Sequence, residues 1–469
     1  MRGEIEQAVT ALRNRKRSAV ELIDECLAAT DARDGVVNAF VTRTADQARQ
    51  TAKRIDREGP DDRPLLGIPF TVKDNIQTAG VRTTAGSLLL AHNVPAVDAP
   101  AVARLKRAGA VMVGKTNCSE FAMDIHTANR LVGVTRNPLD TGRTSGGSSG
   151  GDSAAVAAGF SMFGLGTDYG ASLRWPAHCT GVLTIRPTVG RIPSEGLLPN
   201  DSGHLAKPMN SLSVRGLAHT LGPIARSVSD LRTLLSVLAD FDQQRQRIDP
   251  SRLRVAWFTN VGDVSARADL ARAVEEAADS LAGAGATVEQ RHPPGINEAA
   301  TTMREMRAVD GLVDVERLAA GREDLLADTT RTWLSSSRHT SVTEFQDLAS
   351  KRDGLRADAE EFLDEWPIWL LPVATIPAFE IDATDPARAQ PRFEVDGIEQ
   401  ERYEIVAACW AVSLYGLPSV VIPVARSQDG LPIGVQIVGR PNRDFEVLEV
   451  ASVLEALCGE VLEARRPDA

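Results

Sequence analysis

The sequence predicts an α/β protein in which a mixed, mostly parallel β-sheet is covered by helices on both faces. Short apolar stretches such as "GIPFTVKDN", "AVMVGK" and "FSMFGLGTD" are typical of strands that are buried on both sides. Helical patterns separate these stretches, and such alternation favours a parallel sheet. Strand-like stretches return in "IWLLPVA", "GLPSVVIPVA" and "LPIGVQIVG". We therefore expect the chain to leave the sheet and rejoin it.

A single large domain over residues 1–469 is favoured, because no internal repeat or low-complexity linker divides the chain. The N-terminal segment, about residues 1–60, is predicted to be helical, with two helices joined by a turn. In it, Ser18 and Glu21 form a capping box before "LIDECLAA". A segment of about residues 223–365 is rich in helical pattern and charge, with one strand-like stretch, "RLRVAWF". We expect this segment to be a helical cover within the same domain.

The elements between these two segments follow in order. "PLLGIPFTVKDN" predicts a strand, and Asp98 and Pro100 can start a helix that runs to about Ala108 and ends at Gly109. "AVMVGK" predicts the next strand. "SAAVAAG" predicts a small, tightly packed helix closed by Gly159, and "FSMFGLGTD" predicts another strand.

Composition argues against several classes of partner. The 52 Lys and Arg residues face 63 Asp and Glu residues, giving a net charge of −11 without a long run of either sign. This disfavours a nucleic-acid groove or a polybasic membrane patch. No apolar stretch has the length of a membrane span, and the charged start does not resemble a secretory signal. We expect a cytoplasmic protein that binds neither nucleic acid nor membrane.

Five cysteines are distributed far apart and form no C-x-x-C pair. An odd number at such spacing disfavours a disulfide framework or a zinc site. We expect reduced, buried thiols. The five are Cys26, Cys118, Cys179, Cys409 and Cys458.

Two glycine motifs match known binding or catalytic patterns, but the residues around them do not fit those sites. Residues 109–116, "GAVMVGKT", match the phosphate-binding loop, but the middle four residues are strand formers rather than a flexible cradle. The segment "GGSSGG" contains the G-x-S-x-G pattern of the nucleophile elbow. That elbow needs an apolar strand before the serine, and here "RNPLDTGRTS" precedes it.

Lys73 is a candidate base in "GIPFTVKDN". The chain has only seven lysines, and a desolvated lysine can lose its proton whereas an arginine stays charged. The neighbouring Asp74 faces the other side of the strand, so it need not keep Lys73 protonated. The alternative is a strand-end lysine whose amine reaches water.

Ser172 is a candidate nucleophile in "GLGTDYGASLRWPAHCTG". It follows a strand and a glycine turn and precedes a helical start. Several consecutive amides can point at one spot in such a turn, which suits an oxyanion formed by attack on a carbonyl. The alternative is an ordinary helix-capping serine.

Taken with "GGSSGGDSAAVAAG", these segments resemble the amidase signature family, serine hydrolases of carbon-nitrogen bonds. The similarity extends through "GVLTIRPTVGRIP", "LGPIARSVSDL" and "GLPIGVQIVG", and covers about residues 10–450. It implies the amidase signature fold and a hydrolase acting on carbon-nitrogen bonds other than peptide bonds. The implied substrate is a small carboxamide, aryl amide, hydrazide or ureide, cleaved through an acyl-serine intermediate. No metal or cofactor is implied.

The resemblance also implies a Ser-cisSer-Lys triad. Ser172 corresponds to the nucleophile and Lys73 to the base, while Ser148, after a cis peptide bond from Gly147, corresponds to the bridging hydroxyl. Lys73 must then be neutral, so its pKa must fall by roughly three units from about 10.4. Burial lowers it, and so does the positive end of a helix that starts near Gly151, if that end points at the amine.

Further roles are assigned to residues around this triad. The amides of Tyr169, Gly170 and Ala171 are expected to form the oxyanion hole. The family usually has two glycines where this chain has Gly170-Ala171, but alanine keeps an amide to donate. The expected supporting residues are Gly147, Ser149, Thr167, and Asp168 paired with Arg174.

A substrate pocket is expected beside the nucleophile. Trp175 is bulkier than the residue usual at its position in the family. With Tyr169 and with Phe121 or Met123 it can line an apolar, aryl-accepting pocket. Core packing is the alternative explanation of these side chains.

The segments "TVKDN" and "AGAVMVGKTNCSEFAM" also resemble the A subunit of the glutamine-dependent tRNA amidotransferase. That protein would need partner proteins and glutamine, and this sequence shows no basic surface for tRNA. A non-catalytic protein on the same scaffold is a further alternative, and the intact Lys73, Ser148 and Ser172 set argues against it. Homodimers are common in the family, so a homodimer is possible.

Overall fold

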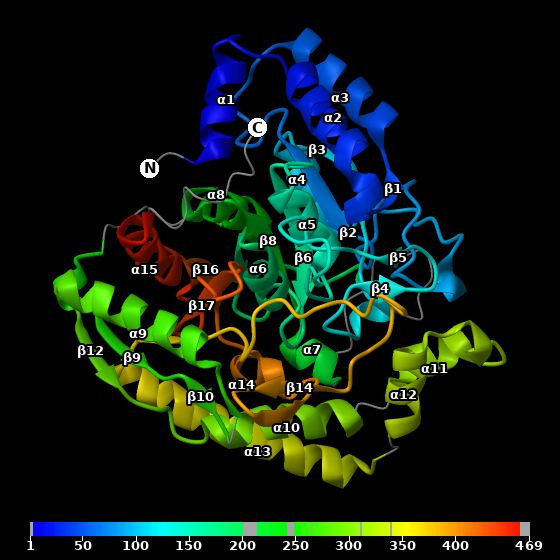
Figure 1. The fold of residues 1–469 in the computed structure, drawn as a ribbon. Helices are drawn as coiled ribbons and strands as arrows, with labels where there is room; N and C mark the ends of the chain where they lie inside the picture. Colours follow the sequence, from blue (N-terminus) through cyan, green and yellow to red (C-terminus); the bar gives the residue numbers. More distant parts are fainter. Residues whose placement is uncertain are drawn as a thin grey trace.

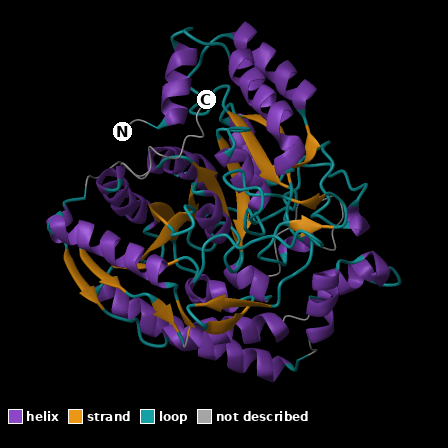
Figure 2. Cartoon of the chain, in the orientation of Figure 1, coloured by secondary structure: helices purple, strands orange, loops and turns teal. Residues whose placement is uncertain are grey.

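The computed structural model describes residues 3–199, 213–241, 248–262, 264–309, 312–337 and 340–459. Within them an 11-stranded mixed sheet forms the centre (Figures 1 and 2). Its order is β1 (Phe40–Arg43), β3 (Val111–Thr116), β2 (Pro69–Lys73), β6 (Phe163–Asp168), β8 (Thr220–Ala225), β7 (Leu183–Arg186), β16 (Ser419–Arg426), β17 (Pro432–Gly439), β13 (Ile368–Pro372), β9 (Arg254–Trp257) and β12 (Thr287–Gln290). Three two-stranded sheets lie outside it: β4 (Ala128–Asn129) with β5 (Gly133–Val134), β10 (Asn260–Val261) with β11 (Val264–Ser265), and β14 (Arg392–Val395) with β15 (Ile398–Glu401).

The predicted large domain with a mixed sheet is confirmed, and parallel pairing is concentrated in two blocks. One block is β3–β2–β6 and the other is β13–β9–β12. The strands between and beside these blocks pair antiparallel. The antiparallel part is therefore larger than the alternation of strands and helices suggested, because β16 returns directly into β17 without a helical crossover.

Three helices open the chain, α1 (Glu4–Arg13), α2 (Ala19–Val37) and α3 (Ala45–Glu58). The predicted capping box is present, because the Ser18 side chain accepts from the Glu21 amide and the Glu21 side chain accepts from the Ser18 amide. The four-residue strand β1, which the sequence analysis did not include, follows α2 and pairs with β3.

The elements that carry the predicted motifs agree with their patterns. Helix α4 (Pro100–Arg107) starts at its proline, and Gly109 after it has a φ of 95°. Helix α5 (Gly150–Ala157) begins in the glycine-serine segment, and α6 (Arg174–Thr180) follows Ser172. The supposed phosphate-binding loop is the buried strand β3, so that alternative is wrong.

The segment around residues 223–365 holds most of the outer helices. They are α8 (Val228–Ala239), α9 (Ala268–Gly283), α10 (Ile296–Val309), α11 (Val313–Ala319), α12 (Asp328–Ser336) and α13 (Val342–Glu365). The same segment also supplies β9 and β12, at one edge of the main sheet. The remaining α-helices are α7 (Val214–Ala218), α14 (Ala407–Tyr415) and α15 (Asp444–Leu457).

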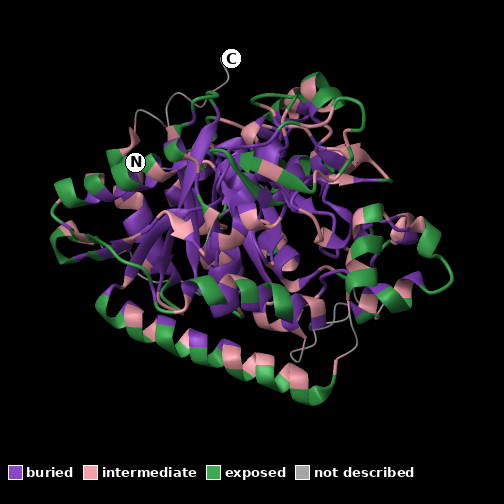
Figure 3. Cartoon of the chain, turned by 60° about the horizontal axis from the view of Figure 1, so that its bottom comes forward, coloured by how far each residue is buried: buried purple, intermediate pink, exposed green. Residues whose placement is uncertain are grey.

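Both faces of the sheet are covered, as the strand β13 shows. Its Leu370 belongs to an apolar cluster that includes side chains of α2, α4, α8, α9 and α15. Its Trp369 and Leu371 belong to a second cluster, with side chains of α6, α10, α13 and α14. Figure 3 shows the buried sheet and the exposed outer sides of the helices. None of the described helices has the length and apolar character needed to cross a membrane.

Candidate active site

The glycine-serine segment passes through a crowded part of the core. The peptide bond between Gly147 and Ser148 is cis. A Cβ on Gly147 would come within 2.6 Å of the carbonyl carbon of Ile125. Gly146 has a φ of 79°, and a Cβ there would lie 2.6 Å from the Cα of Pro176. Close backbone approach thus explains why this segment is rich in glycine.

Lys73 is the last residue of β2, and its side chain has no exposed surface. Its Nζ lies 2.7 Å from the Oγ of Ser148, 2.9 Å from the Oγ of Ser149 and 2.9 Å from the Oγ1 of Thr167. The alternative in which this amine reaches water is wrong, because the strand ends inside the molecule.

Burial lowers the pKa of Lys73 to about 8 from its ordinary value of 10.5. The carboxylates of Asp152 and Asp168 act in the opposite direction and limit the fall. Asp74 is directed elsewhere, since its Oδ2 accepts a hydrogen bond from the amide of Thr84 at 2.9 Å. The amine is therefore much more easily deprotonated than a surface lysine.

Asp168 and Arg174 form a buried ion pair in the turn after β6. The Nη2 of Arg174 lies 2.9 Å from Asp168 Oδ1, and the Nε of Arg186 lies 3.4 Å from the same oxygen. Burial alone would raise the pKa of Asp168, but the two arginines outweigh it and lower this pKa to about 2. Arg174 also donates to the carbonyl of Gly170 at 2.7 Å. This ion pair holds the turn that presents Ser172.

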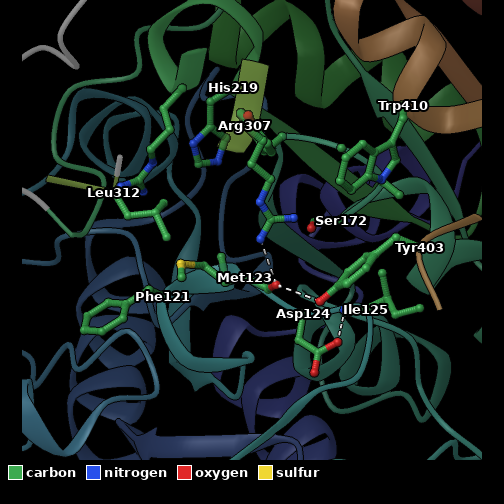
Figure 4. Close-up of a pocket in the computed structure, with 15 residues that line it drawn as sticks. Phe121, Met123, Asp124, Ile125, Ser172, His219, Arg307, Leu312, Tyr403 and Trp410 are labelled. Carbon is green, nitrogen blue, oxygen red and sulfur yellow. Dashed lines mark hydrogen bonds between the residues drawn. The ribbon is translucent and has the colours of Figure 1, made fainter. Parts of the chain in front are cut away.

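Ser172 lies between that turn and α6, and its carbonyl accepts a hydrogen bond from the Ser149 amide at 3.2 Å. This bond joins the turn of Ser172 to the glycine-serine segment. Within the described residues, the hydroxyls of Ser148 and Ser172 are not hydrogen-bonded to each other. Ser172 instead lines a pocket, where Figure 4 labels it.

The amides of this turn are available to a ligand. In the described part of the chain, those of Gly170, Ala171 and Ser172 have no hydrogen-bond acceptor. Ala171 is not among the residues with a positive φ, so its side chain causes no backbone strain. A Cβ on Gly170 would come within 3.0 Å of the Nε1 of Trp410. Glycine thus avoids a tight contact with Trp410 at position 170, and alanine is tolerated at 171.

The pocket beside Ser172 has a volume of about 660 Å³, including its open mouth. It is walled mainly by apolar and aromatic side chains, which is typical of sites for small molecules. Phe121 in the 3₁₀-helix η2 (Glu120–Ala122), Met123 and Tyr169, which the sequence analysis named, are among the residues that line it. The other lining residues are Ala122, Asp124, Ile125, Gly170, Ala171, Arg215, His219, Arg307, Leu312, Tyr403 and Trp410.

The placement of Trp175 in this pocket is wrong. Its side chain is fully buried, its Nε1 donates to the carbonyl of Ile125 at 2.8 Å, and its ring stacks on that of His178. The first turn of α6 directs the indole into the core between the helix and residue 125. Core packing, the alternative explanation, accounts for this residue.

Several pocket residues were missed because they come from segments far from the motifs. Arg307 lies on α10, Trp410 on α14, and Tyr403 just before α14. The sequence predicted a helical cover, but its pattern contains no signal for which residues of the cover face Ser172.

Comparison with known proteins agrees with this architecture. A family model described as Amidase matches residues 21–448, so the chain belongs to the amidase signature family and is a hydrolase of carbon-nitrogen bonds. The chain is 32% identical over 468 residues to the indoleacetamide hydrolase of Bradyrhizobium diazoefficiens, covering 96% of this chain and 85% of that protein.

Other relatives belong to different branches of the family. The A subunit of the glutamyl-tRNA(Gln) amidotransferase of Moorella thermoacetica is 32% identical over 486 residues, covering 95% of this chain and 94% of that protein. The structure of 6-aminohexanoate cyclic dimer hydrolase complexed with substrate superposes with a TM-score of 0.84. It is 27% identical and covers 99% of this chain and 98% of that chain.

Proposed function

We propose that this amidase cleaves a small carboxamide, aryl amide, hydrazide or ureide through an acyl intermediate on Ser172, using no metal or cofactor. Lys73 acts as the base, and Ser148 carries the proton from Ser172 to Lys73. The observation that carries this proposal is the buried amine of Lys73, 2.7 Å from the Ser148 hydroxyl and next to the turn of Ser172.

The hydrogen bonds around the amine favour Ser148 as the bridge. A neutral amine has two N–H groups and one lone pair, and three oxygens surround this one. The hydroxyl of Ser149 donates to the carbonyl of Thr167 at 3.2 Å, so it can only accept from Lys73. Ser148 makes no other side-chain bond in the described structure, so its hydroxyl is free to donate to the lone pair.

The reaction then follows from these contacts. The Ser172 hydroxyl turns toward Ser148 about its Cα–Cβ bond and attacks the amide carbonyl. Its proton passes to Ser148, and the proton of Ser148 passes to Lys73. The relay runs backward to protonate the departing amine, and a water molecule activated in the same way releases the acyl group.

The carbonyl oxygen becomes negatively charged during attack and needs hydrogen-bond donors. We assign this role to the amides of Tyr169, Gly170 and Ala171. The support is that Gly170 and Ala171 have no acceptor within the described chain and that all three residues line the pocket. One such donor is worth about 3 kcal/mol of transition-state stabilisation in other hydrolases.

The pocket walls favour an aryl or other apolar group on the substrate. Tyr403 and Trp410 present rings to the side of the pocket that holds Ser172, and Phe121 lines the opposite side, beyond Met123 (Figure 4). One relative is named indoleacetamide hydrolase, and indoleacetamide is an acetamide with an aromatic ring, so this name fits the same preference.

The A subunit of a tRNA amidotransferase is the second candidate, because such subunits recur among the relatives at 29–32% identity. Glutamine carries an ammonium group that needs an acidic partner. Asp124, the acidic residue among those that line the pocket, already binds Arg402 at 2.7 Å. We therefore favour the independent amidase.

The setting of the enzyme is also part of the proposal. We place it in the cytoplasm, as the sequence analysis expects, and its net charge of −11 without a basic run favours an enzyme that binds neither nucleic acid nor membrane. The family resemblance favours a homodimer. Size-exclusion chromatography with light scattering tests the oligomeric state.

A hydrolysis screen of the purified protein alone tests the function. Aliphatic amides, aryl amides, hydrazides and ureides are compared, with glutamine as a separate arm. Hydrolysis of at least one small amide, lost in Ser172→Ala, is expected. A fluorophosphonate probe should label the wild type and Ser153→Ala but not Ser172→Ala, since Ser153 bonds Thr180 inside the core. Hydrolysis of glutamine and of no other amide in the screen, seen only after partner proteins are added, would support the second candidate.

A further inference from the structure

Arg307 is a buried cation on the pocket wall, with no carboxylate partner in the part of the chain that the structure describes. It lies on α10 and is 8% exposed. Its Nη2 donates to the carbonyl of Met123 at 3.1 Å, and it forms no ion pair within the described residues. Figure 4 shows its guanidinium pointing into the space between Met123 and Ser172. A buried charge without a counter-ion is costly, so such a group calls for an anionic ligand.

Aromatic rings fix the orientation of this guanidinium. Its central carbon lies 3.6 Å from the ring centre of Trp333 and 5.7 Å from those of Tyr403 and Trp410. Such rings stabilise a cation through its face and leave its N–H edge free. Arginine has five N–H donors in a fixed fork, and a single bond to the described residues uses them here. The remaining donors suit the two oxygens of a carboxylate.

The other titratable groups that line the pocket do not neutralise Arg307. Asp124 accepts from both Nε and Nη2 of Arg402, at 2.9 and 2.7 Å. Burial and the charge of Arg215 lower the pKa of His219 well below its ordinary value, so this ring is neutral. Burial raises the pKa of Tyr403 to about 12, so its hydroxyl is neutral as well.

Arg215 adds a second positive charge to the same wall. Its guanidinium contacts the carbonyls of Leu198 and Pro199 at 3.4 and 3.5 Å. Asp124, the carboxylate among the lining residues, is bound by Arg402, so it does not compensate Arg307. An anion is attracted to Arg307 and an ammonium group is repelled by it.

We propose that the substrate is a small amide that also carries a carboxylate, which Arg307 binds while the scissile carbonyl lies at Ser172. This inference rests on the proposed function of Ser172. The apolar side chains of Phe121 and Met123 accommodate the aryl or aliphatic spacer between the two groups. Arg307 is thus a specificity residue that contacts the substrate away from the reacting atoms.

Two matched substrate pairs test this. In each, a carboxylate replaces a methyl group: 4-carbamoylbenzoate against 4-methylbenzamide, and glutaramate against pentanamide. For at least one pair, wild-type kcat/KM is expected to be about 10- to 100-fold higher for the carboxylate, the range of a charge-assisted hydrogen bond. Arg307→Gln should remove this preference, mainly through KM, and change the neutral amide less than about threefold. Arg307→Lys should restore part of it.

Arg304→Gln is the matched control. Arg304 lies three residues earlier on the same helix, is exposed, and does not line this pocket. This variant should keep the wild-type preference. Thermal melting of each variant checks folding, because loss of the stack on Trp333 can destabilise α10.

Binding to Ser172→Ala separates this proposal from the proposed function. By calorimetry, this variant should bind the carboxylate member of at least one pair more tightly than its neutral partner, and adding Arg307→Gln should abolish the difference. The proposal is overturned if neither carboxylate binds better, or if Arg307→Gln weakens both members equally, which would mark a packing role. Should Arg307→Gln fail to fold, two other results test the proposal. The wild type should prefer the carboxylate member of at least one pair, and Arg307→Lys should keep part of that preference; absence of the wild-type preference overturns the proposal. Hydrolysis that persists in Ser172→Ala would overturn the catalytic assignment instead.

Discussion

Lys73 and Lys115 lie on the neighbouring parallel strands β2 and β3, and both are fully buried. Burial lowers the pKa of each to about 8. Their surroundings differ. Lys73 faces three hydroxyl groups beside the pocket. Lys115 donates to the carbonyl of Ile76 and to the hydroxyl of Thr78, and the charge of Asp74 opposes the fall of its pKa.

The comparison shows that a lowered pKa is not sufficient for a catalytic base. A base also needs a hydroxyl that can pass it a proton from the substrate side. Ser148 offers that route to Lys73, because it is adjacent to the turn of Ser172. The carbonyl beside Lys115 has no proton to give, and the Thr78 hydroxyl donates its own proton to that carbonyl at 3.2 Å. Burial raises the pKa of Asp74, and the charge of Lys115 instead acts to lower it.

The largest expected effect is on turnover in Lys73→Met. We expect kcat to fall by about 10³-fold or more, because the variant keeps the apolar stem but has no lone pair for the proton. Steady-state kinetics on the best amide of the screen measures this, with circular dichroism as the folding control. Wild-type turnover in Lys73→Met would refute the mechanism.

Lys115→Met should affect stability rather than chemistry. The substitution leaves Asp74 buried without a nearby cation, so the free energy of unfolding should decrease by about 3 kcal/mol. Denaturant unfolding measures the loss, and kcat of the folded protein should stay within about threefold of wild type. A large fall in kcat with unchanged stability would show that Lys115 takes part in the reaction.

The two neighbouring serines sharpen the comparison further. Ser148→Ala breaks the proposed relay and should lower kcat by about 10²-fold or more. Ser149→Ala removes only an acceptor of the amine and the bond to Thr167, so we expect about a tenfold decrease. Equal effects of the two variants, measured on the same amide, would contradict the assignment of Ser148.

The pH dependence of kcat/KM should follow the protonation of Lys73. Below a pH of about 8 the amine gains a proton and loses its lone pair, so kcat/KM should fall about tenfold per pH unit. Above that pH it should level off. A neutral amide is the substrate for this profile, and Lys115→Met should show the same midpoint. A flat profile between pH 6 and 9 would exclude a base with this pKa.

The smallest effect is expected for Trp175→Phe. The ring stays in the core, but the hydrogen bond from its Nε1 to the Ile125 carbonyl is lost, at a cost of about 1 kcal/mol in unfolding free energy. KM should not change. Trp410→Phe is the contrasting variant, since Trp410 lines the pocket and a change in KM is expected there.

Much of the fold could be predicted because its signals are local. The apolar runs of β2, β3 and β6 are continuous in the chain, and the capping box of Ser18 and Glu21 spans four residues. Strand β1 was missed because four residues are too few for a clear periodicity. The extent of antiparallel pairing was missed because the direction of a strand depends on which neighbour it meets.

The candidate site divides in the same way. Lys73 and Ser172 lie in short motifs whose strands and glycines made them candidates, and the resemblance of the glycine-serine segment to the amidase signature family added Ser148, so all three could be named before the structure. Arg307 could not, because its place in the pocket depends on how α10 packs beside a turn more than 130 residues earlier, and no local pattern records that contact.

The sequence by itself determined the buried strands, the helix ends and the short motifs that hold the proposed triad, because these depend on neighbours along the chain. Tertiary packing decided the direction of the Trp175 ring, the different surroundings of the two buried lysines and the position of Arg307 on the pocket wall. Each of these depends on which distant groups lie within a few ångströms, and that distance is set only when the helices pack on the sheet.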